Sequence, residues 1–191
     1  MMRLHLVRHG PTHAKCMVGW TDLPADLSDT AALQRLSDHL PQQAVMLSSD
    51  LTRAVATANA ISLPTRQRLP HDSDWRELHF GAWEMRGFAE IEAEDPDRIR
   101  AFWETPGEVR PPQGESWNDV LARVGAALDR LTAHGPDVIV VCHFGAIVAA
   151  LQSCLGLTSE QAFSHRIDNL SVTQLHKTAA GWDEIAVNHR P

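Results

Sequence analysis

The chain has 191 residues, of which 43% are hydrophobic and 21% are charged, and its formal net charge is −7. This composition is typical of a globular protein with one well-buried core. The acidic balance argues against nucleic-acid-binding and anionic-membrane-binding proteins, because either surface needs a clustered basic face. We therefore expect one domain over residues 1–191 whose partner is a small molecule, with no nucleic acid and no membrane.

The cysteines and histidines bear on location and on metal binding. Cys16, Cys142 and Cys154 form no CxxC spacing, and the chain shows neither a signal-peptide pattern nor an apolar run long enough to span a bilayer. These features predict a cytoplasmic protein. The eleven histidines match no HExxH or paired Cys/His spacing, so we expect most of them to be solvated or capping residues. We expect no bound metal and no cofactor.

The first predicted strand ends in a polar turn. In residues 4–12 (LHLVRHGPT), apolar and polar side chains first alternate, an apolar pair follows, and the apolar pattern ends at Arg8 and His9. This order indicates a short buried strand followed by a polar turn. Ligands of open α/β sheets bind beyond the carboxyl ends of the strands. Arg8 and His9 are therefore candidate site residues, and the alternative is a capped surface turn with a solvated histidine. Residues 12–24 are predicted to form a long loop over this strand end.

The next elements place an arginine at a helix start. Ser28 is the expected N-cap of a helix that stops before Pro41, and residues 44–47 form a short apolar strand. Residues 48–50 are expected to open a second helix, with Arg53 in its first turn. A cation there opposes the helix dipole, so Arg53 is better explained by a bound anion than by helix stability. The alternative is an ordinary exposed arginine.

Residues 75–84 place two carboxylates among aromatic side chains. Trp75, Phe80 and Trp83 surround Glu77 and Glu84 in this short stretch. Aromatic neighbours shield a carboxylate from water, and burial raises its pKa toward values useful for proton transfer. Both glutamates are therefore candidate proton donors, and the alternative is that both are surface carboxylates.

The following region is predicted to be an inserted helical cap. Residues 87–112 contain two short helical patterns, separated at Pro96 and closed by further prolines. After the cap, Ser116 and Asp119 have the spacing of a capping box that starts a helix through Leu131.

The second half of the chain repeats the opening pattern. Residues 138–142 are a continuous apolar run, followed by His143 and an apolar helix over residues 146–155. Residues 171–176 and 182–187 predict a closing antiparallel hairpin. If the strands are neighbours in a parallel sheet, then His9, Arg53 and His143 meet at one edge.

Such a cluster favours a site for a tetrahedral dianion. Arginine forks match phosphate oxygens and stay charged at any working pH. A neutral imidazole is a competent nucleophile toward phosphorus, and cationic side chains disperse the transition-state charge without a metal. The residues therefore predict hydrolysis of a phosphomonoester.

Five motifs resemble one family, the histidine phosphatases of the phosphoglycerate-mutase-like superfamily. They are LVRHGPT at 6–12, SDLTRA at 49–54, RELHFGAWE at 76–84, PQGES at 112–116 and VCHFG at 141–145. The resemblance implies a three-layer α/β/α sandwich with a mostly parallel central sheet.

The resemblance also implies roles for individual residues. His9 would be the nucleophile that becomes phosphohistidine, and Glu77 would be the general acid and then the general base. The phosphoryl group would be held by Arg8, Arg53 and His143, with Thr12, Lys15 and Phe144 as further candidate phosphate-binding residues.

Within the family, residues 77–84 and the short chain are similar to small bacterial phosphatases of the α-ribazole phosphatase type. The chain departs from the usual pattern at Lys15, where the family often has asparagine, and at Ala31 and Met85, where it often has glycine. We expect a metal-independent hydrolase of a small phosphorylated metabolite, with α-ribazole phosphate as a candidate. The alternatives are a phosphoglycerate-mutase-type phosphoryl transferase, which the short cap disfavours, and a catalytically silent phosphoanion-binding module.

Overall fold

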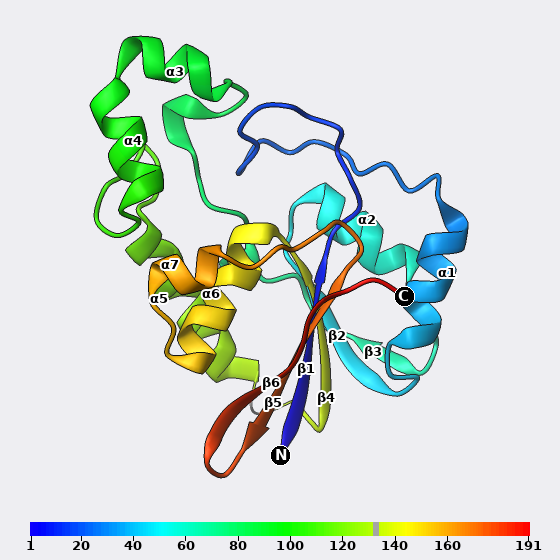
Figure 1. Ribbon diagram of the computed structural model, residues 1–191. Coiled ribbons are helices and arrows are strands. Elements are labelled where there is room, and N and C mark those ends of the chain that lie inside the picture. Colours follow the sequence, from blue (N-terminus) through cyan, green and yellow to red (C-terminus); the bar gives the residue numbers. More distant parts are fainter. Residues whose placement is uncertain (132–133) are drawn as a thin grey trace.

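The computed structural model describes residues 1–131 and 134–191, and in these residues six strands form one sheet (Figure 1). Their order is β3–β2–β4–β1–β5–β6. Strands β3, β2, β4 and β1 run parallel, whereas β5 and β6 are antiparallel. The strands are β1 (Met2–Arg8), β2 (Ala44–Ser48), β3 (Arg66–Arg68), β4 (Asp137–Cys142), β5 (Val172–Thr178) and β6 (Gly181–His189). The mostly parallel sheet and the closing hairpin are thus confirmed.

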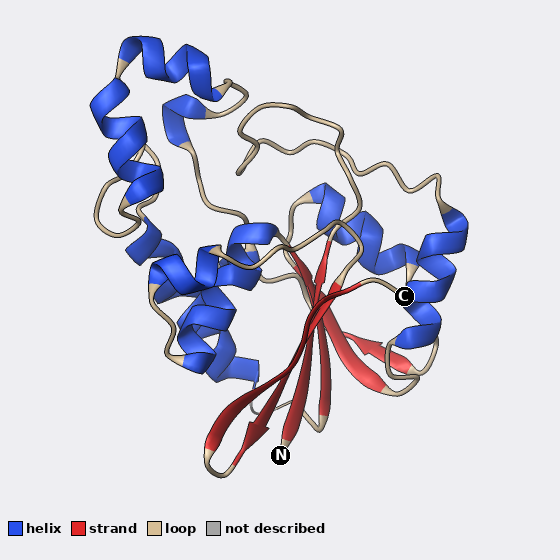
Figure 2. Ribbon diagram, viewed as in Figure 1, coloured by secondary structure: helices blue, strands red, loops and turns tan. Residues whose placement is uncertain are grey.

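Helices cover both faces of this sheet, so the predicted three-layer sandwich is confirmed (Figure 2). The α-helices are α1 (Thr30–His39), α2 (Thr52–Ala60), α3 (Phe88–Glu94), α4 (Pro96–Glu104), α5 (Trp117–Leu131), α6 (Phe144–Leu155) and α7 (Ser159–Phe163). Two short 3-10 helices span Ser73–Trp75 and Gly81–Trp83.

The alternation of strand side chains divides the core into two halves. Ile139 and Val141 of β4 pack with buried residues of α1 and α2, and Val138 and Val140 pack with those of α5 and α6. Successive side chains of a strand point to opposite faces, so a strand buried on both faces is apolar throughout. This explains why residues 138–142 of β4 are a continuous hydrophobic run.

Helices α3 and α4 occupy the region predicted to be a cap and stand away from the sheet, on the side to which the carboxyl ends of β1 and β4 point (Figure 1). Pro96 is the first residue of α4, and Asp95 caps this helix by accepting a hydrogen bond from the Arg98 amide. Proline favours this position because its missing N–H would have no partner in the helix.

The two expected helix starts in the first third of the chain were wrong by a few residues. Asp29, not Ser28, caps α1 by accepting from the Ala32 amide at 2.9 Å. Helix α2 begins at Thr52, because β2 extends to Ser48 and the next two side chains have other partners. Ser49 contacts His143 and Asp50 pairs with Arg76. The side chains of Ser49 and Asp50 therefore make tertiary contacts instead of capping α2.

The capping box at the start of α5 is confirmed, because Ser116 and Asp119 exchange amide and side-chain hydrogen bonds. Most histidines are expected to be solvated or capping, and three of the eleven lie inside the protein instead; two of these three, His9 and His143, are predicted site residues. His5, His9 and His143 are buried. Cys16, Cys142 and Cys154 are free thiols, and no described helix combines the length and the apolar character needed to cross a membrane.

Candidate active site

The parallel strands bring three sequence-distant segments to one edge of the sheet. β1 pairs with β4, and β4 pairs with β2, so the residues that follow these strands become neighbours. The His9 amide donates to the Cys142 carbonyl at 3.0 Å. As a result, the His9 and His143 ring centroids lie 4.9 Å apart with a tilt of 59°.

His9 is held in one tautomer. Its Nδ1 lies 2.6 Å from the Gly10 carbonyl oxygen. A carbonyl only accepts, so Nδ1 carries the proton and Nε2 keeps its lone pair. Burial and the positive charges of Arg53 and Arg8 lower the pKa of His9 to about 3. The imidazole is therefore neutral at ordinary pH and offers Nε2 as a nucleophile.

His143 is fully buried and is oriented by Ser49. Its Nε2 lies 2.9 Å from Ser49 Oγ, which also accepts from the Leu51 amide. The hydroxyl hydrogen is then available to His143 Nε2, which leaves the ring proton on Nδ1. Nδ1 is buried without a hydrogen-bond partner in the described residues. Burial, together with the nearby His9 and Arg53, places the pKa of His143 well below its usual value.

The two arginines of the cluster come from different elements, Arg8 from the end of β1 and Arg53 from α2. Arg53, in the first turn of α2, is 1% exposed, and its two terminal nitrogens donate to the carbonyls of Thr21 and Gly19 at 2.9 and 2.6 Å. Arg8 donates through Nη1 to the Ile167 carbonyl, and its buried Nε has no partner among the described residues. Burial lowers the pKa of both guanidinium groups, which nevertheless stay charged.

Glu77 is half-buried beside the arginines. Its Oε1 accepts from the amides of Leu78 and Gly145 at 3.0 and 2.8 Å. Burial raises the pKa of Glu77, although these amides and the charges of Arg8 and Arg53 act in the opposite direction. Gly145 is required by the close approach, because a Cβ there would lie 2.3 Å from Oε1. The expectation that the aromatic segment shields a carboxylate is met at Glu77.

Glu84 has a different environment. Burial alone would raise its pKa, but the Thr21 hydroxyl and several backbone amides lower it below the ordinary value. The amide donors are those of Gly19, Trp20, Thr21 and Phe80, at 2.8–3.2 Å. Glu84 therefore fastens the loop of residues 9–29 to the segment that carries Glu77.

The remaining predicted phosphate ligands differ in position. Phe144 is the first residue of α6, and the Arg8 guanidinium lies over its ring, 5.7 Å from the centroid. Thr12 is half-buried and Lys15 is exposed, both on the loop. Within the described part of the chain, neither is joined to the cluster by a hydrogen bond or ion pair. The structure thus joins Phe144 to the site through Arg8, whereas the roles of Thr12 and Lys15 stay predictions.

Three residues of the site were missed from the sequence. Ser49 orients His143, and Asn169 donates to the His9 carbonyl at 2.8 Å. Arg123 donates to the carbonyls of Asp74, Arg76 and Glu77, and so fixes the backbone that carries the buried carboxylate. These residues come from separate elements, so no local pattern marks them. Only the position of Ser49 directly after a strand was a usable signal.

The comparisons with known proteins agree with this geometry. A family model described as histidine phosphatase superfamily, branch 1, matches residues 4–190. The chain belongs to the histidine phosphatase superfamily. The predicted family and enzyme class are thereby confirmed. Among the described residues, no group of three or more His, Cys, Asp or Glu side chains is placed to hold a metal ion.

Individual relatives of this histidine phosphatase are distant. The bifunctional protein Rv2228c of Mycobacterium tuberculosis is 31% identical over 93% of the chain, which spans about half (51%) of that relative's length. A protein of Proteus mirabilis named probable phosphoglycerate mutase GpmB is 27% identical, with 95% and 88% of the two chains covered. The solved structure of the α-ribazole phosphatase from Shigella flexneri has a TM-score of 0.86, 26% identity, and coverage of 99% and 97%.

Proposed function

We propose that this histidine phosphatase hydrolyses the phosphomonoester of a small metabolite, without a metal ion, through a phosphohistidine on His9. The observation that carries the proposal is the state of His9. A ring that is neutral, with its proton fixed on Nδ1, directs the Nε2 lone pair into a cluster of positive charge. Two nitrogens of the site, Arg8 Nε and His143 Nδ1, are buried without a partner in the described part of the chain, and both are donors suited to phosphoryl oxygens.

The first step is phosphoryl transfer to the enzyme. His9 Nε2 attacks phosphorus, and the bond between phosphorus and the ester oxygen breaks. Arg8 and Arg53 supply positive charge to the transition state, which a metal would otherwise supply. Glu77, whose pKa is raised, gives its proton to the departing alkoxide, so the alcohol leaves neutral.

The second step returns the enzyme to its starting state. Glu77, now a carboxylate, accepts a proton from a water molecule as its oxygen attacks the phosphorus of phosphohistidine. The bond between Nε2 and phosphorus breaks, inorganic phosphate leaves, and His9 is again neutral. The same carboxyl group thus acts as acid and then as base.

The proposed substrate is a small phosphorylated metabolite, and α-ribazole phosphate is a candidate because the Shigella neighbour is an α-ribazole phosphatase. We also propose a cytoplasmic location, which the free thiols support. A screen of the purified enzyme against phosphorylated metabolites tests the proposed substrate. Phosphoglycerate-mutase-type transfer is the second candidate function, favoured by the name of the Proteus relative.

A p-nitrophenyl phosphate assay tests the proposed activity. The wild-type enzyme should hydrolyse this ester, His9→Ala should lose activity, and His13→Ala should keep it, because His13 is exposed on the same loop. Activity should survive EDTA and be blocked by vanadate, which mimics pentacoordinate phosphorus. Equal rates for wild type and His9→Ala, or an EDTA loss restored by zinc or magnesium, would overturn the proposal.

A further inference from the structure

A pocket lies beside Glu77, where the cap helix α4 faces α5, α6 and α7. Apart from Glu77, the lining side chains in the described part of the chain are hydrocarbon or aromatic. Six of them are aromatic: Phe80, Phe102, Trp103, Trp117, Phe144 and Phe163. A mostly apolar wall with one ionisable group is the usual composition of a small-molecule site.

The two walls of the pocket are held by ring packing. On the cap side, the Phe102 and Trp103 centroids lie 5.0 Å apart in an edge-to-face arrangement. On the opposite side, Trp117 and Phe163 lie 4.5 Å apart. The Trp117 Nε1 donates to Gln152 Oε1 at 2.8 Å, so its polar atom is already satisfied. These contacts leave mainly carbon surface toward the pocket.

The pocket shares Glu77 and Phe144 with the candidate active site. Phe144 lines the pocket and also lies under the Arg8 guanidinium. Glu77 lines the pocket and accepts from the Gly145 amide at the start of α6. In the proposed reaction, Glu77 protonates the oxygen that joins phosphorus to the organic part of the substrate. The organic part must therefore begin next to Glu77, where the aromatic wall begins.

We infer that the enzyme selects phosphomonoesters whose organic part carries an aromatic or other apolar group that packs into this pocket. The inference rests on the proposed function, since Glu77 marks the leaving side of the substrate. It places α-ribazole phosphate, a ribose ester with an aromatic base, within the preferred class. It places small polyol phosphates outside that class.

The physical reason is the desolvation of polar groups. A hydroxyl that leaves water for an aromatic wall without gaining a hydrogen bond loses free energy, whereas an aromatic ring gains from the same transfer. An apolar pocket discriminates by about 10–100-fold between ligands that differ in this way.

The test compares 2-phenylethyl phosphate with glycerol 3-phosphate. Both are dianionic esters of primary alcohols, so the two leaving oxygens are chemically alike and the organic parts differ in polarity. We expect kcat/KM to be at least about tenfold higher for the phenylethyl ester. Equal values, or a higher value for glycerol 3-phosphate, overturn the inference.

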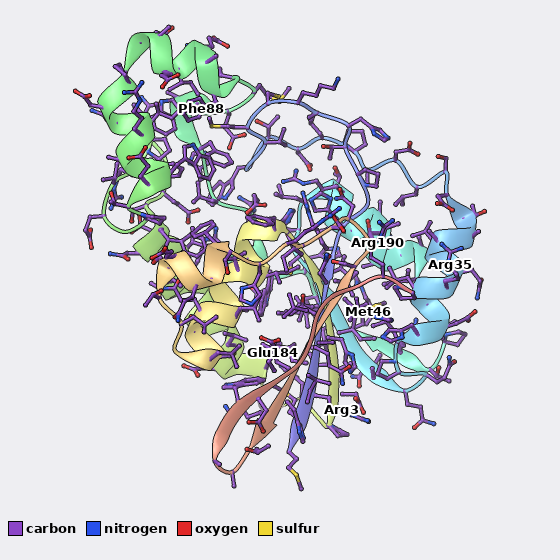
Figure 3. All side chains as sticks on the ribbon, viewed as in Figure 1. Arg3, Arg35, Met46, Phe88, Glu184 and Arg190 are labelled. Atoms are coloured by element: carbon purple, nitrogen blue, oxygen red, sulfur yellow. The ribbon has the colours of Figure 1, made fainter. Side chains whose placement is uncertain are left out.

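A matched pair of cap variants locates the preference. Trp103 and Phe88 are both exposed aromatic residues of the cap, at 41% and 44%, but of these two only Trp103 lines the pocket. Figure 3 labels Phe88 on the cap. Trp103→Ala should lower kcat/KM for the phenylethyl ester by about tenfold, and leave glycerol 3-phosphate unchanged. Phe88→Ala should change neither. Equal losses for both esters, or for both variants, contradict the inference.

His9→Ala separates the two possible failures. If hydrolysis depends on His9 and the polar ester is preferred, the proposed function stands and the inference about the pocket is wrong. If neither ester is hydrolysed although p-nitrophenyl phosphate is hydrolysed with dependence on His9, the inference alone is wrong. If His9→Ala retains the wild-type rate, both the proposed function and the inference are wrong.

Discussion

The surroundings of Glu77 and Glu84 differ although the residues are seven positions apart in one short segment. Glu77 accepts two amide hydrogen bonds and its pKa is raised by burial. Glu84 accepts bonds from four amides and a hydroxyl, and its pKa is lowered. The comparison teaches that the number of donors decides whether a sheltered carboxylate holds or gives up its proton.

Replacing Glu77 or Glu84 by glutamine is expected to show the largest difference between the two carboxylates. Glu77→Gln keeps the shape and removes the proton donor, so phosphoryl transfer from an alkyl phosphate should fall by about 10²–10⁴-fold. Transfer from p-nitrophenyl phosphate should fall much less, because p-nitrophenolate leaves without a proton. Phosphoenzyme formation in a single turnover is the step to measure. If Glu84→Gln shows this leaving-group dependence instead, the assigned carboxylate is wrong.

Gly145→Ala tests whether the position of Glu77 matters. The new Cβ would lie 2.3 Å from Glu77 Oε1 and must displace the carboxyl group. Misplacement of a reacting group by about 1 Å costs about 10²-fold, so alkyl phosphate turnover should fall by that amount. Gly125→Ala, a helix position with open space around it, is the control. Unchanged turnover in Gly145→Ala would argue that Glu77 takes no part in the reaction.

Glu84→Gln should have a smaller effect of another kind. The carboxylate holds Gly19 and Thr21, whose carbonyls accept from Arg53, so its loss loosens the anchor of this arginine. Replacing a residue that only positions another residue lowers activity by about tenfold at the low end of the usual range. We therefore expect Glu84→Gln to slow the hydrolysis of alkyl and aryl esters equally, by about this factor. Steady-state kinetics with an alkyl and an aryl ester measure this. Unequal slowing would place Glu84 in the proton transfer itself.

The buried histidines predict a pH dependence of stability. His9 stays neutral in the folded state down to pH about 3, whereas in the unfolded chain it gains a proton near its ordinary pKa. Stability should therefore fall as pH drops from about 6.5 toward 3, by at most about 1.4 kcal/mol per pH unit for this group. His9→Asn should flatten the slope in urea unfolding between pH 6.5 and 4.5. Equal slopes for the two proteins would show that His9 is not buried neutral.

Much of the fold and part of the site were predictable from the sequence. The β4 run and the cap helices follow recognisable hydrophobic patterns, Arg8 is the last residue of β1, and His9 and His143 stand directly after strands. Glu77 and Glu84 were not separable by local pattern, because their difference comes from donors on the loop of residues 9–29. Ser49, Asn169 and Arg123 escaped notice for the same reason. Their partners are far away in the sequence, and only tertiary packing brings them together.

The most direct test of the account is the chemical identity of the phosphorylated residue. Rapid quenching with a phosphorus-labelled ester should trap an acid-labile, base-stable phosphoryl group on wild-type enzyme and on His13→Ala. The account predicts no such label on His9→Ala, because its nucleophile is absent. Equal labelling of His9→Ala and wild type would contradict the central claim that His9 carries the phosphoryl group.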